Sequence, residues 1–233
     1  AGNKGDVQVK IDGKAANDQA TISTDKNTLT VAFAEKAVKA NAGKSIEVTF
    51  KAKIREGVNL LDYLVPGQGI RIPNKASYDI DHNPKFHKDS NEVPVTPPSP
   101  EQPPIEKDVN DKAEATLEAR DEEFTYHVKT KIPYEATAFN ITDTLKDVLD
   151  FSGEKGQAEA TVDGKKLSDD HIAINGQTIT VTLNQEELKA NADKDIKLTF
   201  KAKIRPNANL AAYVVGDKVV INNQASYNVD LPD

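Results

Sequence analysis

Two stretches of the chain, about 150 residues apart, have nearly the same sequence. The heptapeptide Thr49–Arg55 returns unchanged as Thr199–Arg205, and the residues around Asn74 return around Asn223. A period this long indicates two tandem domains of one type, because short-unit solenoids repeat every ~20–50 residues. Tandem domains are typical of a chain that has to be long or to display something at a distance.

A proline-rich segment separates the two copies. Five of the ten residues in 97–106 are proline, which favours an extended, semi-rigid spacer. We therefore expect a first module at 1–96, a linker at 97–106 and a second module at 107–233.

The two modules are expected to be unequal. Ala1–Gly5 aligns with Ser152–Gly156, so the first module lacks a counterpart of residues 107–151. The second module ends before any counterpart of residues 86–95 and is expected to lack a final strand.

Alternation of polar and apolar residues indicates half-buried strands. It is clear in Phe124–Val128, Thr178–Leu183 and Ile196–Ile204. Asp163-Gly164 and Asn175-Gly176 lie between such runs and predict hairpin turns. Many short strands with regular turn signals predict an all-β fold of antiparallel, immunoglobulin-like β-sandwich modules.

Two short helices are also expected. They lie at Glu35–Ala40 and Asn184–Ala190, and Asn184 followed by two acidic residues resembles a helix N-cap.

Charge and composition exclude several classes of function. The net charge is −7, and the 30 basic residues are scattered among 37 acidic ones, which argues against a nucleic-acid partner. No apolar run approaches the ~20 residues that span a bilayer, so we expect no membrane insertion. With no cysteine, disulfides and thiolate metal sites are excluded. The lack of methionine indicates a processed or excised piece, and the lack of both oxidisable side chains favours an extracellular location.

The sequence shows no signature of an enzyme, a cofactor site or a metal site. The four histidines (His82, His87, His127 and His171) lack metal-ligand spacing, and His82 and His87 are interpreted as part of a charged loop. No phosphate-binding glycine loop, nucleophile elbow or zinc-protease motif is present. We therefore expect neither a cofactor nor catalytic turnover.

The second module carries a series of short motifs in a distinctive order. They are Lys107–Asn110, Tyr126–Val128, Ile132-Pro133, Ile141–Leu145 and Ile221–Ala225. Together they resemble the isopeptide-forming domains of Gram-positive fimbrial proteins, the sortase-anchored major pilins and fibrillar adhesins. The resemblance covers the second module and the back half of the first, and it implies sandwiches of the collagen-adhesin type.

The resemblance implies a covalent bond between the side chains of Lys107 and Asn223, assisted by the acid Asp143. Physical chemistry supports such a trio, because burial lowers the pKa of an ammonium and yields a nucleophilic amine. A buried carboxyl that stays protonated can donate a hydrogen bond to the amide oxygen. The reaction runs once per domain, so it is maturation and not turnover.

Two of these residues also have ordinary structural explanations. A lysine after a proline-rich linker is usually a solvated strand-end residue, and an aspartate before Thr-Leu is most often a turn or a cap. Asn222 is the neighbouring amide, but in a strand it points to the opposite face. The equivalent Asn74 is expected to stay an unpaired amide, because its lysine and acid belong to the missing front half.

Two functions are consistent with these features. The first is a structural subunit or stalk of a Gram-positive cell-surface fibre, located outside the cell on the cell wall, with copies of itself, sister pilus subunits and sortase as partners. The alternative is a surface adhesin whose modules bind a host surface protein. The aromatic content of 6% favours the stalk, because recognition surfaces are enriched in aromatic residues.

Overall fold

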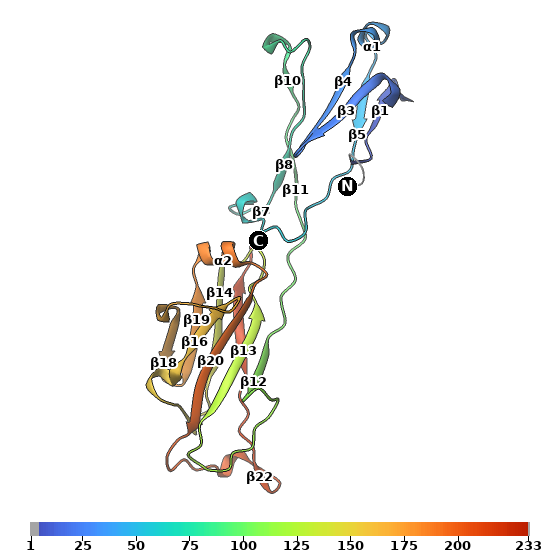
Figure 1. Ribbon diagram of the computed structural model, residues 1–233. Coiled ribbons are helices and arrows are strands. Elements are labelled where there is room, and N and C mark those ends of the chain that lie inside the picture. The colour runs from blue at the N-terminus through green and yellow to red at the C-terminus, as the bar shows by residue number, and fades with distance from the viewer. Residues whose placement is uncertain (1–4, 233) are drawn as a thin grey trace. The chain divides into compact units, whose positions relative to one another are not determined.

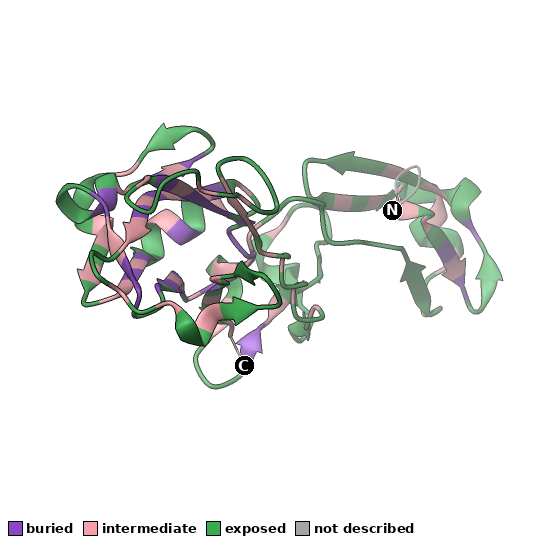
Figure 2. Cartoon of the chain, turned by 90° about the horizontal axis from the view of Figure 1, so that it is seen from below, coloured by how far each residue is buried: buried purple, intermediate pink, exposed green. Residues whose placement is uncertain are grey.

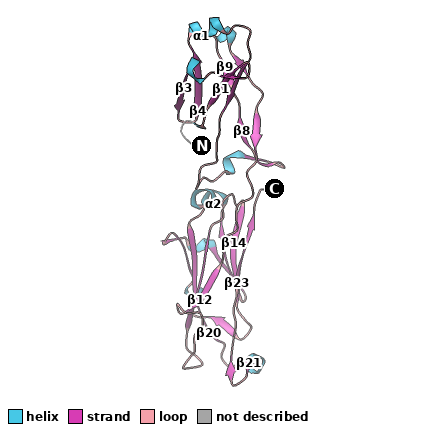
Figure 3. Ribbon diagram, turned by 90° about the vertical axis from the view of Figure 1, so that its right-hand side faces the viewer, coloured by secondary structure: helices cyan, strands magenta, loops and turns pink. Residues whose placement is uncertain are grey.

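The computed structural model describes residues 5–232, so parts of the predicted modules at residues 1–4 and 233 lie outside the described residues. The chain divides into two compact units, the N-terminal unit Ala1–Val58 and the C-terminal unit Asn59–Asp233. Strands make up most of the regular structure in both (Figures 1 and 3). This division falls before the proline-rich segment, and the module boundaries at 96 and 107 stay a prediction.

The N-terminal unit contains two small antiparallel sheets. Strands β2, β1 and β5 form one sheet in that order, and β3 and β4 form a hairpin. The elements are β1 (Gln8–Ile11), β2 (Lys14–Ala15), the 3-10 helix Asn17–Gln19, β3 (Ala20–Asp25), β4 (Thr28–Phe33), α1 (Glu35–Ala40) and β5 (Ile46–Thr49).

The C-terminal unit begins with three two-stranded ribbons. They pair β6 with β7, β8 with β11 and β9 with β10. The elements are the 3-10 helix Leu61–Tyr63, β6 (Leu64–Val65), β7 (Gly69–Ile70), β8 (Ile72–Asn74), β9 (Ser77–Tyr78), the 3-10 helix Pro84–Phe86, β10 (Lys88–Asp89) and β11 (Val93–Val95).

The rest of this unit is a two-sheet β-sandwich with a separate β21–β22 ribbon, and every strand pairing in it is antiparallel. One sheet has the order β12-β13-β20-β16-β17, with β15 also on β20, and the other has the order β18-β19-β14-β23. The strands are β12 (Glu106–Val109), β13 (Phe124–Lys131), β14 (Ala138–Thr144), β15 (Leu149–Phe151), β16 (Glu159–Val162), β17 (Lys165–Lys166), β18 (Ile172–Asn175), β19 (Thr178–Leu183), β20 (Asp195–Ile204), β21 (Val214–Val215), β22 (Lys218–Val219) and β23 (Ala225–Asp230). The helices are α2 (Gln185–Asn191) and the 3-10 helices Glu154–Gln157, Asp169–His171 and Ala211–Tyr213. The prediction of an all-β, immunoglobulin-like fold is confirmed; the tandem arrangement of two such sandwiches stays a prediction.

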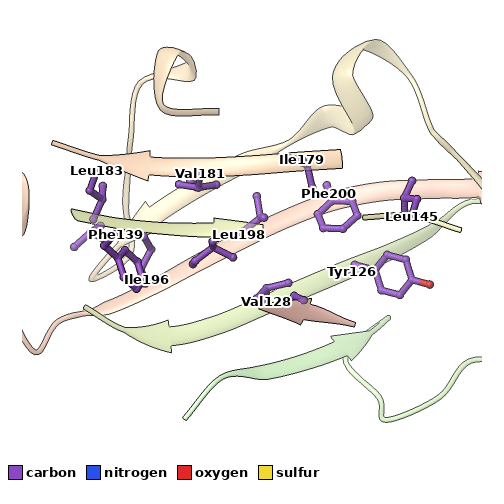
Figure 4. Close-up of a cluster of buried hydrophobic side chains, with 14 of the residues drawn as sticks. Tyr126, Val128, Phe139, Leu145, Ile179, Val181, Leu183, Ile196, Leu198 and Phe200 are labelled. Atoms are coloured by element: carbon purple, nitrogen blue, oxygen red, sulfur yellow. The ribbon is translucent and has the colours of Figure 1, made fainter. Parts of the chain in front are cut away.

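The core of the sandwich lies between its two sheets (Figure 4). Alternate residues of β20, namely Ile196, Leu198 and Phe200, are at most 1% exposed. They pack in one cluster with Ile179 and Val181 of β19 from the other sheet. Figure 2 shows that buried residues are concentrated in this part of the chain.

Local sequence signals account for the caps and turns. Asn184 caps α2 by accepting a hydrogen bond from the backbone of Glu187, whose side chain accepts one from the backbone of Asn184. Asp163 and Gly164 both have positive φ and join β16 to β17, as type I′ hairpin turns require. The second turn is shifted by one residue, because Asn175 pairs with Thr178 and leaves Gly176-Gln177 as the loop.

One glycine has the same close contact in both copies of the repeat. Gly5 and its counterpart Gly156 both have positive φ, and a Cβ on either would lie about as close to a backbone oxygen. The distance would be 2.9 Å to Lys51 O in the first copy and 3.0 Å to Lys201 O in the second. A side chain is excluded at both positions, so glycine is required twice for the same reason.

Candidate functional site

Strand β12 holds Lys107 at the edge of one sheet, where it pairs with Val128 of β13. Its side chain is 13% exposed, so the ammonium lies largely out of water. The ammonium nitrogen lies 4.0 Å from the ring centroid of Tyr126 and 5.2 Å from that of Phe200. Lys107 is therefore a core-facing residue and not a solvated strand end.

Asp143 comes from the opposite sheet. It lies near the end of β14, between Ile179 of β19 and Ala225 of β23, and its side chain is fully buried. Two residues before it, Ile141 is also fully buried, so the strand alternation places the acid on the core face. Its Oδ2 accepts a hydrogen bond from the ammonium of Lys107.

Asn223 lies two residues before β23 and completes the group. Its Nδ2 donates a hydrogen bond of 2.7 Å to Oδ1 of Asp143. Its Oδ1 is buried and has no hydrogen-bond partner among the described residues. The neighbouring Asn222 is exposed, as the alternation predicted. The sequence had placed Asn223 within a strand, but the β14–β23 ladder ends at the Asp143–Ala225 pair.

Burial dominates the electrostatics of the group. It lowers the pKa of the Lys107 ammonium from its ordinary value, because desolvation outweighs the opposing attraction of Asp143. Burial also raises the pKa of Tyr126 to about 12, with the negative charge of Asp143 as a second cause. Both pKa shifts disfavour the charged form of the side chain, because Lys107 and Tyr126 lie in the same apolar surroundings.

The arrangement can move protons between the two nitrogens. One carboxylate oxygen of Asp143 contacts the amine of Lys107 and the other contacts the amide nitrogen of Asn223. A carboxylate in this position can take a proton from the amine and hand one to a departing ammonia. The structure differs from the sequence-based expectation in one detail, because the acid contacts the amide nitrogen and not the amide oxygen.

The three residues bring distant parts of the sandwich together. Lys107 belongs to the first strand of one sheet, and Asn223 lies two residues before the last strand of the other. More than a hundred residues of chain separate them. A bond between their side chains would join both sheets as well as the first and last strands.

Asn74, the counterpart of Asn223, lies in different surroundings. It ends β8, pairs with Val93 of β11 and is exposed. The adjacent Lys75 forms an ion pair of 3.1 Å with Asp89. That Asn74 is an ordinary amide stays a prediction.

Sequence reasoning missed two kinds of contact at the site. The aromatic rings of Tyr126 and Phe200 lie beside the Lys107 ammonium; strand alternation indicates that both rings face inward, but not that they contact the lysine. The end of the proline-rich segment is fastened to the sandwich, because Thr130 and Tyr227 donate hydrogen bonds to the carbonyls of Pro104 and Pro103. No local sequence signal predicts such long-range bonds.

A second polar cluster lies on the outer face of the same strands. Nδ1 of His127 lies 2.6 Å from Oδ1 of Asp108 and 3.4 Å from Oδ1 of Asp111, so the three side chains have ligand atoms close enough to hold a cation. The Lys129 ammonium lies 3.3 Å from the other oxygen of Asp108 and already supplies a positive charge. No local pattern predicts this cluster, because His127 meets the two aspartates only through the β12–β13 pairing.

No helix in the described part of the chain is long and apolar enough to cross a membrane.

The side chain of His87 contacts Asp79 and Asp89, which agrees with a charged loop.

Comparison with known proteins finds a curated relative and several solved structures. It is 98% identical over 233 residues to Platelet adherence protein A of Streptococcus gordonii strain Challis, and it spans 6% of the length of that protein. The solved structures with some similarity include the pilus backbone RrgB of Streptococcus pneumoniae, which is 24% identical to this chain. The match covers 55% of this chain and 31% of RrgB, with a TM-score of 0.42. The N-terminal domain of the Streptococcus gordonii adhesin Sgo0707 is 22% identical, covering 54% and 29%, also with a TM-score of 0.42.

By name, these relatives are an adherence protein, a pilus backbone and an adhesin. They agree with the resemblance that the motifs of the second module indicated. The family model of the Sgo0707 N2 domain matches residues 102–231, more than half of the chain and all three residues of the candidate site. The chain therefore belongs to the Sgo0707 N2 domain family.

Proposed function

We propose that the chain is a stalk segment of a Gram-positive surface fibre, hardened by an isopeptide bond between Lys107 and Asn223. The observation that carries the proposal is the fully buried Asp143, which contacts both reacting groups with its two carboxylate oxygens. The fibre would be attached to the cell wall by sortase, with further copies or sister subunits as its neighbours. The chain would not act as an enzyme on external substrates.

The bond would form in a single turnover. The Lys107 ammonium gives a proton to Asp143, and the resulting amine attacks Cγ of Asn223. The bond from Cγ to Nδ2 breaks, and the nitrogen leaves as ammonia after receiving a proton through Asp143. The products are a secondary amide, ammonia and a protonated Asp143, so atoms and charges balance. Fixed geometry of this kind is worth effective molarities of ~10⁵ M or more, enough for a poor electrophile such as an amide.

A stalk needs resistance to extension, and the position of the bond would provide it. With the first and last strands of the sandwich joined, tension along the chain passes through the cross-link and bypasses the polypeptide between Lys107 and Asn223. Hydrogen-bonded ladders between strands would otherwise be the only resistance. The mechanical role therefore follows from where the two residues lie in the topology.

Single-molecule pulling on the full chain from its two ends tests this role. We expect the segment between Lys107 and Asn223 to stay unextended in the wild-type chain and to extend in Asp143→Ala. Asp108→Ala is the matched control, because it removes a carboxylate from the outer face of the same sandwich and should behave as wild type. Full extension of the wild-type chain would refute the proposal.

The alternative is a surface that binds a host protein, and the name of the 98% identical relative is the observation in its favour. The chain is a small part of that protein, so the name does not locate the adherence function. The open hollow beside α1 is lined by Glu35, Lys36, Lys39 and Ala40, which is not the apolar groove an adhesin would use. Platelets should therefore not adhere to a surface coated with this chain, and specific, saturable adherence would favour the alternative.

A further inference from the structure

The N-terminal unit repeats part of the sandwich with the same strand register. In its β1–β5 ladder Ile11 lies opposite Ile46, and in the β16–β20 ladder the counterparts Val162 and Ile196 lie opposite each other. The β3–β4 hairpin likewise has the register of β18–β19. The two copies are therefore comparable strand by strand.

The two copies differ in what lies beside these strands. In the sandwich, β20 also pairs with β13 and β19 also pairs with β14. Within the described part of the N-terminal unit, β5 pairs only with β1, and β4 pairs only with β3. Both missing neighbours correspond to strands from residues 107–151, the stretch without a counterpart in the first copy. The edges of β5 and β4 that are open in the N-terminal unit are therefore the edges that β13 and β14 cover in the sandwich.

Exposed apolar side chains accompany these edges. Ile46, Val48 and Phe50 are 56%, 38% and 46% exposed, whereas their counterparts Ile196, Leu198 and Phe200 are 1%, 0% and 0% exposed. Leu29, Val31 and Phe33 of β4 are half-buried, and their counterparts in β19 are at most 3% exposed. The same residue types are exposed or half-buried in one copy and form the core in the other.

The lengths of the strands also indicate that β5 lacks a partner strand. Strand β20 runs for ten residues, Asp195–Ile204, and is paired with β13 over eight of them. Strand β5 has four residues, Ile46–Thr49, and stops where its pairing with β1 stops, although Thr49–Arg55 is identical to Thr199–Arg205. The sequence therefore allows a longer strand, and a partner strand is what it lacks.

We propose that the open edges of β4 and β5, with the apolar side chains beside them, form a docking surface for a two-strand segment of the kind formed by β13 and β14. The segment adds one strand to each edge and covers the apolar face, a mode of recognition in which backbone bonds supply affinity and alternate side chains supply specificity. Unpaired edges with apolar neighbours are otherwise an aggregation hazard.

The occupant that fits is a segment with the pattern of residues 105–151, which a longer relative has the chain length to supply. The 98% identical relative contains far more chain than these 233 residues, of which they are 6%. A second copy of this chain fits less well. Its own 105–151 segment already forms the β13–β20 and β14–β19 ladders and would have to leave them to dock elsewhere.

A fusion tests the inference in the full chain. A second copy of residues 105–151 is joined directly in front of Ala1, because Phe151 precedes Ser152, the counterpart of Ala1. The grafted copy carries Lys107→Ala, so covalent chemistry plays no part and failure of the cross-link proposal does not affect the result. Hydrogen exchange is then followed at residues 28–33 and 46–54.

We expect exchange at these amides to slow at least about tenfold in the fusion. Val128→Asp in the grafted copy, on the face that is fully buried in the sandwich, should abolish the protection, whereas Lys129→Asp on its exposed face should not. Unchanged exchange in the fusion would overturn the inference. Protection that rises with concentration in the unfused chain would also overturn it, because it would assign the surface to a second copy.

Discussion

The side-chain amide of Asn223 donates a hydrogen bond of 2.7 Å to Asp143, a fully buried acid 80 positions earlier in the chain. Because the other oxygen of the same carboxylate contacts Lys107, one acid connects two groups that can condense with loss of ammonia. A buried ion pair alone is weak evidence for stability, since desolvation offsets most of the attraction. An ion pair next to a buried amide has a chemical use, because the amine and the amide can form a covalent bond.

Replacing Asp143 with alanine should leave a folded sandwich without a cross-link. The acid moves protons but does not become part of the bond, and its loss relieves the core of a carboxyl. The intact mass of Asp143→Ala should equal its sequence mass. If Asp143→Ala still lacks the mass of one ammonia, Asp143 is not the assisting acid; Asp108→Ala, on the outer face, should lose ammonia normally.

The cross-link should raise the free energy of unfolding of the sandwich. By analogy with a disulfide, closing a loop of more than a hundred residues restricts the unfolded chain by about 4–5 kcal/mol. Lys107→Ala and Asn223→Ala should each lose this stabilisation, and the double variant should lose little more, because one bond is removed in all three. Chemical denaturation measures the effect, with Lys129→Ala as the exposed control, and additive losses would contradict a shared bond.

Proteolysis should reach the first copy before the second. The strands of residues 1–96 have short ladders and exposed apolar side chains, so local opening costs less there than in the sandwich. Limited digestion of the wild-type chain should leave a resistant fragment beginning near residue 100, and Lys107→Ala should lose this resistance. The prediction is wrong if the sandwich is cleaved at the same rate in wild type and variant, or if the first copy is the more resistant of the two.

The unlinked chain should become more stable as the pH rises. In Asn223→Ala the Lys107 ammonium stays buried with a lowered pKa, whereas in the unfolded chain its pKa is ordinary, near 10.5. Between these two values the unfolded state binds more protons, so the free energy of unfolding increases with pH. Denaturation from about pH 7 to about pH 10 should show this slope, and adding Lys107→Met should remove it. If Lys107→Met leaves the slope unchanged, another group causes the pH dependence.

Local signals predicted the elements well, because each depends on neighbouring residues. Alternation located β19 and all but one residue of β20, and Asn184 marked the start of α2. The grouping of Lys107, Asp143 and Asn223 came only from the family resemblance. Nothing local indicates that β12 and the end of β14 face each other across a core. The orientation of the amide and the bonds from Thr130 and Tyr227 to the proline-rich segment depend on packing and were not predicted.

The intact mass of the wild-type chain tests the central claim most directly. Lys107, Asp143 and Asn223 meet in one place, whereas Asn74 is exposed on β8, so one cross-link per chain is expected. The measured mass should fall short of the sequence mass by one ammonia, and fragmentation should locate a branched peptide joining Lys107 to Asn223. A deficit of zero, or of two ammonia molecules, would contradict the account.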